Sequence, residues 1–274
     1  MKKFCIVIPI YKYELDILDK LSLNRLNKIV KTKYDLFFVK PESLNCENYY
    51  KIFNKELVTE ISFKDSYFEN TDSYSQLCIQ YDFYNTFSNY EYMYIYQTDC
   101  YLVKDELNAW CDKGYDYIGA PIISSNANWV NIKNPNKWEP QVGNGGFSLR
   151  KVEVFKDITD PNGEFRKKYD LTDDKLDKVI FEDKYFLNDI YDYYEVITPS
   201  WIESLFFAMD MNVDVIYDIM KFKGLPMGIH AWGKNIRYWQ NVLEELKDNK
   251  KVIDFCENKY KEFFDLYYKK QEDQ

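Results

Sequence analysis

The sequence predicts an α/β fold with a mostly parallel central sheet flanked by helices. Two observations support this prediction. Short apolar runs alternate with longer stretches in which apolar residues recur every three or four positions, as strands alternate with amphipathic helices in such folds. The apolar runs at the start of the chain are also nearly continuous, which is typical of parallel strands that are buried on both faces.

The first hundred residues predict the order strand, helix, strand, strand, helix, strand. The expected strands are residues 4–10, 34–39, 57–63 and 92–97, and the expected helices are residues 15–30 and 74–87. Ligands of parallel α/β sheets bind at the carboxyl ends of the strands. A site is therefore expected around the loop after Ile10, the pair Lys40 and Pro41, and Asp99.

The second half of the chain is less regular. We expect strands at residues 115–120 and from residue 147, a polar loop at 124–141, a helix at 181–190, a loop at 224–233 and an amphipathic helix at 252–267. No internal repeat and no linker rich in Gly, Ser or Pro divides the chain. The predicted organisation is one α/β domain over residues 1–240, with a helical extension over residues 241–274 packed on it.

Composition excludes several classes of protein. The 36 Lys and Arg against 45 Asp and Glu give a net charge of −9, so a broad cationic face for nucleic acid is not expected. No apolar stretch is long enough for a transmembrane helix, and the first apolar run is too short for a signal peptide. Six cysteines without a Cys-x-x-Cys pair indicate reduced thiols in a cytoplasmic protein. Contact with the inner face of a membrane and the oligomeric state stay open.

Two segments carry residues suited to ligand binding. Asp99 directly follows an apolar strand, where burial of a carboxylate requires a partner and where its oxygens suit a divalent cation. A turn or a helix cap is the alternative interpretation. Gly143 to Gly146 include Asn144, and glycines allow the backbone to approach a ligand closely while the Asn144 amide could bind a sugar hydroxyl. A tight turn is the alternative there.

Two further segments carry candidate acid–base groups. Glu182 and Asp183 are adjacent, so on a helix they point about 100° apart and one of them can face a pocket as a general base. A solvated helix start is the alternative. His230 is the only histidine, in a loop beside Trp232 and Lys234, and imidazole is a common metal ligand and an acid or base near neutral pH. An ordinary packed histidine is the alternative.

At these residues the sequence resembles glycosyltransferases of the nucleotide-sugar-binding A-type fold. More narrowly, it is similar to a poorly characterised family of glycosyltransferase-like proteins. The segments that carry the resemblance are residues 7–11, 96–99, 116–121, 143–150, 182–183 and 228–231, in that order. The resemblance implies a single Rossmann-like domain that binds a nucleoside-diphosphate sugar, with a UDP-sugar favoured, and uses Mn²⁺ or Mg²⁺.

The resemblance also implies roles for individual residues. Gln97, Thr98 and Asp99 stand where the family of folds has its Asp-x-Asp metal motif, although Gln97 brings no charge. His230 would complete the metal site with Asp99. The remaining nucleotide-sugar contacts implied are Pro9, Tyr11, Lys40 and Lys234.

The implied reaction moves a sugar to a hydroxyl of a glycan or another acceptor. Asp183, with Glu182 beside it, would supply the general base of an inverting transfer. Acceptor or donor sugar would contact Asn144, Gly145, Gly146, Trp201 and Trp232. Two alternatives stay open, namely a non-catalytic glycan- or nucleotide-binding protein and a phosphotransferase of surface-polysaccharide synthesis.

Overall fold

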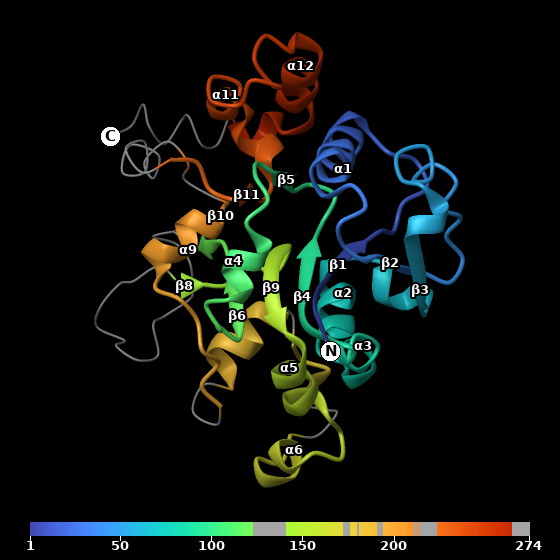
Figure 1. Cartoon of the computed structure of the whole chain (residues 1–274), viewed down its shortest axis with the longest axis vertical. Helices are drawn as coiled ribbons and strands as arrows, with labels where there is room; N and C mark the ends of the chain where they lie inside the picture. Colours follow the sequence, from blue (N-terminus) through green and yellow to red (C-terminus); the bar gives the residue numbers. More distant parts are fainter. Residues whose placement is uncertain are drawn as a thin grey trace.

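The computed structural model describes residues 1–122, 141–171, 176–179, 181–190, 194–210, 213 and 224–264. Within these ranges, the centre of the molecule is a six-stranded sheet with the order β3-β2-β1-β4-β9-β6 (Figure 1). Its strands are β1 (Lys2–Pro9), β2 (Leu36–Pro41), β3 (Val58–Phe63), β4 (Tyr90–Tyr96), β6 (Tyr117–Gly119) and β9 (Phe147–Lys151). β1 pairs in parallel with β2 and β4, and β2 with β3, whereas β9 is antiparallel to β4 and β6. The predicted α/β fold with a mostly parallel sheet is confirmed.

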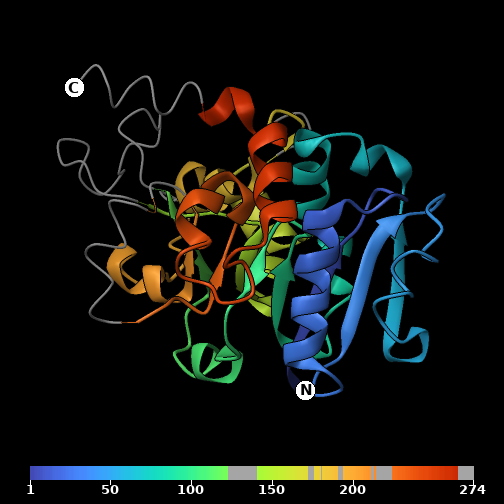
Figure 2. The ribbon, with the colours of Figure 1, turned by 90° about the horizontal axis from the view of Figure 1, so that it is seen from above.

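The two faces of the sheet bury alternate residues of each strand, as the two-residue period of a strand requires. In β1, Phe4 and Ile6 lie in one hydrophobic cluster, and Cys5 and Val7 lie in the other. The first cluster is shared with α1 (Ile17–Val30), α4 (Leu107–Cys111) and α9 (Trp201–Phe207). The second is shared with α2 (Thr71–Cys78), α3 (Tyr81–Asn85) and α5 (Val152–Thr159). The sheet is thus covered on both faces by helices (Figure 2).

The start of α1 is fixed by a capping box. The Asp16 side chain accepts hydrogen bonds from the backbone N–H groups of Leu18 and Asp19, and the Asp19 side chain accepts from the Asp16 N–H. Each bond satisfies a backbone donor that the first turn of a helix leaves without a partner. This cap places the amino end of α1 beside the carboxyl end of β1, at the edge of the sheet where the site is expected.

The single helix expected at residues 74–87 is wrong. The chain forms two short helices there, α2 and α3, with Ile79 and Gln80 between them. Leu77, Cys78 and Ile79 are all fully buried. Three consecutive residues of one straight helix point about 100° apart and cannot all face the same sheet, so the helix ends after Cys78 and restarts.

Two smaller sheets lie beside the central one. β5 (Tyr101–Leu102), β10 (Ala208–Met209) and β11 (Gly228–Ile229) form one, and β7 (Pro121–Ile122) pairs with β8 (Gln141–Val142) in the other. β11 lies within residues 224–233, so the loop expected there is partly wrong. Gly228 permits this strand, because a Cβ at that position would lie 1.9 Å from the Phe147 ring. The loop expected at 124–141 lies outside the described residues as far as residue 140.

The other helical elements are short. They are η1 (Lys55–Leu57), η2 (Asp65–Phe68), α6 (Glu164–Lys168), α8 (Glu182–Lys184), the π-helix η3 (Tyr185–Asp189), η4 (Trp232–Asn235), α11 (Ile236–Trp239) and α12 (Lys250–Lys259). α12 contacts α1 and α11, and its Val252 and Cys256 share a hydrophobic cluster with Leu18 and Trp232. Among the described residues, no helix combines the length and the hydropathy needed to span a bilayer.

Candidate active site

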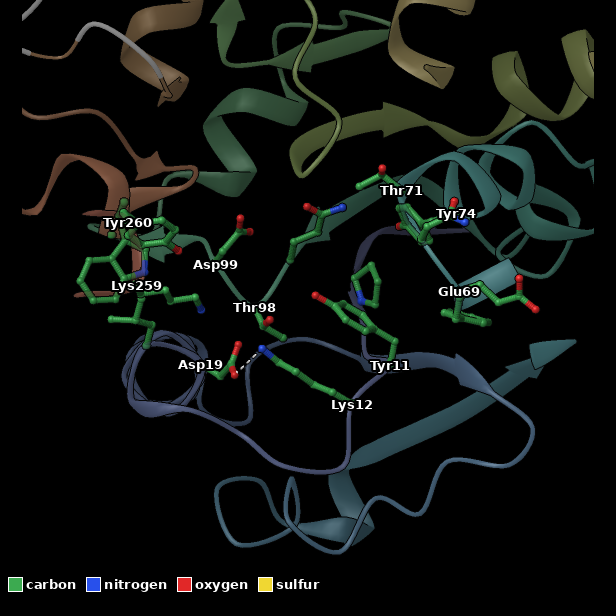
Figure 3. Close-up of a pocket in the computed structure, with 17 residues that line it drawn as sticks. Tyr11, Lys12, Asp19, Glu69, Thr71, Tyr74, Thr98, Asp99, Lys259 and Tyr260 are labelled. Carbon is green, nitrogen blue, oxygen red and sulfur yellow. Dashed lines mark ion pairs between the residues drawn. The ribbon is translucent and has the colours of Figure 1, made fainter. Parts of the chain in front are cut away.

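A cavity of about 430 Å³ lies at the carboxyl ends of β1 and β4 (Figure 3). Five of the predicted nucleotide-sugar contacts line it, together with the predicted sugar contact Trp232. Those five are Pro9, Tyr11, Gln97, Thr98 and Asp99. Pro9 ends β1, Tyr11 follows that strand and the other three follow β4, so the parallel pairing of the two strands brings both segments to one edge of the sheet.

The cavity does not include the other two predicted nucleotide-sugar contacts. Lys40 is buried beneath the loop after β2, where its Nζ donates to the Leu44 carbonyl at 2.9 Å and lies 3.6 Å from a Glu60 oxygen. Lys234 is exposed and does not line the cavity. Trp201 also lies elsewhere, half-buried at the start of α9.

The cationic side of the cavity comes from residues that the sequence patterns did not reveal. Lys12 Nζ lies 2.6 Å from Asp19 Oδ2, an ion pair that Figure 3 marks, and Lys259 Nζ lies 2.7 Å from Asp16 Oδ2. Tyr260 lies beside Lys259. The sequence could have predicted Lys12 as a cavity residue, because it follows β1. No local sequence signal indicates that the end of α12 lies at this cavity.

Three titratable side chains, Asp99, Asp210 and His230, form a group that we call the histidine cluster. His230 follows β11, and its backbone N–H donates to the Met209 carbonyl at 2.8 Å. Its Nε2 lies 3.6 Å from Asp99 Oδ1, and its Nδ1 lies 3.3 Å from Asp210 Oδ1. Burial lowers the pKa of His230, but the two carboxylates outweigh it and raise that pKa to about 9. Asp210 was missed because it belongs to no recognisable motif.

The donor atoms of this cluster fit a divalent cation. Asp99 Oδ1 is buried and has no hydrogen-bond partner among the described residues, and His230 Nε2 lies 3.6 Å from it. A Cβ on Gly146 would lie 2.4 Å from both Gln97 Oε1 and His230 Nε2, so the absence of a side chain leaves these two donors facing one small space. Carboxylate, amide and imidazole groups are suitable ligands for such an ion.

Cys100 is a poor candidate for a further ligand. Its Sγ lies with the Asp99 and His230 donor atoms inside one 4.8 Å group. However, the thiol donates to the Gly146 carbonyl at 3.2 Å, and burial raises the pKa of Cys100 well above its usual range. A metal ligand must be the thiolate, which this environment disfavours. Cys100 therefore serves to hold the loop at Gly146.

The glycine loop, residues 143–146, lies against the histidine cluster. Asn144 Nδ2 donates to Asp210 Oδ2 at 3.1 Å, and Asn144 Oδ1 accepts from the Gly146 N–H at 2.9 Å. The Gly146 carbonyl in turn accepts from the Gln97 N–H at 3.0 Å. Both Nδ2 and Oδ1 of Asn144 thus form hydrogen bonds within the protein, and these bonds hold the glycine loop in place.

The other side of the loop meets four side chains that we call the arginine cluster: Arg150, Glu182, Ser75 and Tyr84. Arg150 Nη2 lies 2.9 Å from Glu182 Oε1, and Arg150 Nη1 donates to the Tyr84 hydroxyl at 2.9 Å. The Ser75 hydroxyl donates to Glu182 Oε2 at 2.9 Å. Both oxygens of Glu182 are therefore engaged. A Cβ on Gly145 would lie 2.3 Å from Glu182 Oε1, so this carboxylate packs directly on the loop.

Asp183 differs from its neighbour Glu182. It is half-buried, and the Lys184 backbone N–H donates to its Oδ1 at 2.8 Å. Burial and the charge of Glu182 raise the pKa of Asp183 to about 8, against smaller lowering effects of the Lys184 N–H, Arg150 and the Gly145 N–H. A carboxylate with a raised pKa suits proton transfer near neutral pH. Asp183 does not line the 430 Å³ cavity, but it contacts the glycine loop that borders the histidine cluster.

The sequence matches one protein family over residues 58–230, from β3 to His230, which is more than half of the chain. That family is described as a protein of unknown function, DUF5672. The chain belongs to this family. The match to DUF5672 includes Asp99, the glycine loop, both carboxylates of the 182–183 pair and the histidine. No curated protein matches the sequence.

Solved structures extend the comparison to the fold. Apo mouse xyloside xylosyltransferase 1 is similar with a TM-score of 0.53 and 14% identity, over 83% of this chain and 97% of that one. The galactosyltransferase LgtC, bound to donor and acceptor sugar analogues, is similar with a TM-score of 0.50 and 10% identity, over 82% of this chain and 86% of that one. At such low identity the likeness concerns the fold, which is the A-type glycosyltransferase fold.

Proposed function

We propose that this protein is a metal-assisted glycosyltransferase that moves a sugar from a nucleoside-diphosphate sugar to a hydroxyl of a glycan or another acceptor. The observation that supports this most is the convergence of Gln97, Asp99 and His230 at the end of β4, beside the 430 Å³ cavity. Pro9, which ends β1, and Tyr11, which follows that strand, line the same cavity. We favour a UDP-sugar as donor and Mn²⁺ or Mg²⁺ as the ion.

The cavity suits the nucleoside diphosphate. The Tyr11 side chain is exposed and aromatic, so a base can stack on it. Lys12 and Lys259 bring positive charge to the same cavity, each now paired with a carboxylate of α1 or of its cap. A divalent ion held by Asp99, His230 and Gln97 would neutralise the charge that develops on the departing diphosphate.

The general base in this proposal is Asp183. Glu182 has both oxygens engaged in the arginine cluster and cannot accept a proton without breaking that network. Asp183 keeps a raised pKa and lies against Gly145 of the glycine loop, whose other side borders the proposed ion site. In its ionised form it takes the proton of the acceptor hydroxyl as that oxygen attacks the anomeric carbon, which gives inversion.

The test is transfer or hydrolysis of a panel of UDP-, GDP-, CMP- and dTDP-sugars with MnCl₂, with mass analysis of the products. Asp183→Asn is expected to lower kcat/KM by about 10²–10⁴, because it removes the base without changing the side-chain volume. In the parent, kcat/KM is expected to rise with pH through about 8, since the base acts only when ionised. Asp189→Asn is the matched control, because Asp189 lies on the adjoining π-helix and pairs with Lys184.

Two outcomes would replace the proposal. Parent-level turnover in both Asp183→Asn and Asp99→Asn would show that the site is elsewhere. Tight binding of a glycan or nucleotide with no turnover and no dependence on metal would indicate a binding protein. This is the second candidate function, because the uncharged Gln97 stands where the motif has an acid. A product that carries phosphate instead of sugar would indicate a phosphotransferase.

A further inference from the structure

Asp210 is the member of the histidine cluster that has no part in the reaction described above. It follows β10, is 9% exposed and does not line the cavity. Its side chain meets two groups, His230 Nδ1 at 3.3 Å from Oδ1 and Asn144 Nδ2 at 3.1 Å from Oδ2. Its backbone carbonyl accepts from Asn235 Nδ2 at 3.0 Å. A nearly buried carboxylate is thus held between the imidazole and the glycine loop.

An imidazole can bind a cation through only one of its nitrogens at a time. The partner of the other nitrogen fixes the ring orientation and decides which nitrogen is presented. Here His230 Nδ1 faces Asp210, which leaves Nε2 facing Asp99 Oδ1 at 3.6 Å and the space above Gly146. Asp210 therefore selects the nitrogen that points to the proposed ion site.

The second oxygen of Asp210 acts on the loop. Through Asn144 it is joined to the Gly146 N–H, and Gly146 is the position at which any side chain would collide with both Gln97 Oε1 and His230 Nε2. One carboxylate thus holds the imidazole from behind and fixes the loop that closes the other side of the same donor atoms.

We propose that Asp210 is a positioning residue that orients His230 for a divalent cation and couples the cation site to the glycine loop. The inference rests on the proposed metal assistance and concerns a residue that this function does not otherwise use. It predicts that a change at Asp210 weakens binding of the cation although Asp210 does not touch it.

The single histidine makes a site-specific test possible. With labelled histidine the full chain gives the imidazole signals of a single residue, and a bound paramagnetic Mn²⁺ broadens them most strongly, at the lowest MnCl₂ concentration, when the ion lies at His230, because the effect falls steeply with distance. This matters because a chain with a net charge of −9 also attracts Mn²⁺ elsewhere. We expect Asp210→Asn to move the MnCl₂ midpoint of this broadening about 10- to 100-fold higher.

Two further variants complete the design. Asp116→Asn is the matched control, because Asp116 is also nearly buried and accepts from the Ile197 N–H at 3.0 Å, away from the cavity. Its midpoint is expected to equal that of the parent. Asn144→Ala removes the amide that links Asp210 to the Gly146 N–H but leaves Asp210 in place. The MnCl₂ midpoint of this variant is therefore expected to rise by less than that of Asp210→Asn. Thermal unfolding without metal shows that each variant is folded.

The outcomes separate this inference from the proposed function. If folded Asp210→Asn has the same MnCl₂ midpoint as the parent, the positioning role of Asp210 is wrong. The proposed glycosyltransferase function is still supported in that case, provided that turnover depends on Asp99 and Asp183. If Asp210→Asn does not fold, the test is the folded Asn144→Ala variant. An MnCl₂ midpoint equal to that of the parent would then show that the cation site is not coupled to the glycine loop through Asp210. If Mn²⁺ at millimolar concentration leaves the parent signal sharp, His230 is not a cation ligand and the inference is wrong.

Discussion

The glycine loop separates two polar clusters that differ in how fully their charged and polar atoms are paired. In the arginine cluster, Arg150 is fully buried and its charge is met by Glu182, while Ser75 and Tyr84 complete the hydrogen bonds. In the histidine cluster, Asp99 Oδ1 is buried without a hydrogen-bond partner among the described residues, and His230 Nε2 faces it at 3.6 Å. The Asp99 side chain is also 46% exposed toward the cavity.

This difference in pairing distinguishes side chains that stabilise the fold from side chains that have a binding atom left for a ligand. A buried ion pair is tolerated when hydrogen bonds satisfy its remaining atoms, and it then has no capacity for a further partner. A buried carboxylate oxygen without a hydrogen-bond partner is costly by itself, and a bound cation removes that cost. On this argument Glu182 positions the loop, whereas Asp99 and His230 are the groups that would bind the proposed cation.

The largest effect on stability is expected from breaking the arginine cluster. Arg150→Met leaves Glu182 buried without its countercharge, which is expected to lower the free energy of unfolding by about 3–5 kcal/mol. Urea unfolding followed by circular dichroism measures it.

Two comparisons make this prediction specific. The double variant Arg150→Met with Glu182→Gln is expected to recover part of the loss, because no unpaired charge remains buried. Lys151→Met removes the next cation along the chain, whose pair with Asp116 spans 3.8 Å and is partly exposed, and is expected to cost less than about 1 kcal/mol. A similar loss in the Arg150 and Lys151 variants would contradict the contrast between the clusters.

A smaller effect is expected from adding one methyl group on either side of the loop. In Gly145→Ala the new Cβ would lie 2.3 Å from Glu182 Oε1 and 2.9 Å from Arg150 Nη2, both held by the network, so a loss of about 1–3 kcal/mol is expected. In Gly146→Ala the methyl group would collide with Gln97 Oε1 and with the His230 ring, which Asp210 holds from behind. That variant should also lose stability, but it alone should lose the Mn²⁺ effect on the histidine signal, because its methyl group fills the space between the proposed donor atoms.

The measurement is again urea unfolding, paired with the MnCl₂ titration of His230. The two glycines are adjacent, so local backbone propensity is nearly the same in both variants. An unchanged titration in Gly146→Ala, or a lost one in Gly145→Ala, would show that the loop does not divide the two clusters.

The sequence predicted the parts of the fold that depend on local pattern. The strand at residues 4–10 and the helix at 15–30 follow from an apolar run and from apolar residues at helical spacing, and the structure confirms them as β1 and α1. The break between α2 and α3 was not predictable, because it depends on three consecutive residues all facing a sheet that the local pattern does not show. The antiparallel direction of β9 is likewise set by its neighbours β4 and β6.

The site shows the same limit. Asp99 was singled out because a carboxylate follows an apolar strand, and its place beside the cavity agrees with the rule for strand ends. Asp210 and Lys259 carry no such local signal. Their positions depend on β10 pairing with β11 and on α12 packing against α1, which are contacts between segments far apart in the chain. Lys40 has the local signal of Asp99, yet the loop after β2 buries it beside Glu60.

The smallest effect on stability is expected at Asp99, and there the contrast between the clusters is sharpest. Asp99→Asn keeps the shape of the side chain but removes a charge that is half exposed and 3.6 Å from His230, so the free energy of unfolding should change by less than about 1 kcal/mol. Metal-dependent turnover should nevertheless fall at least about 10²-fold, because the anionic ligand is gone. Calorimetric unfolding without metal, together with the sugar-transfer assay, checks both parts. A loss of stability as large as that of Arg150→Met would mean that Asp99 holds the fold as Glu182 does, and the unpartnered Asp99 Oδ1 would then no longer point to a ligand.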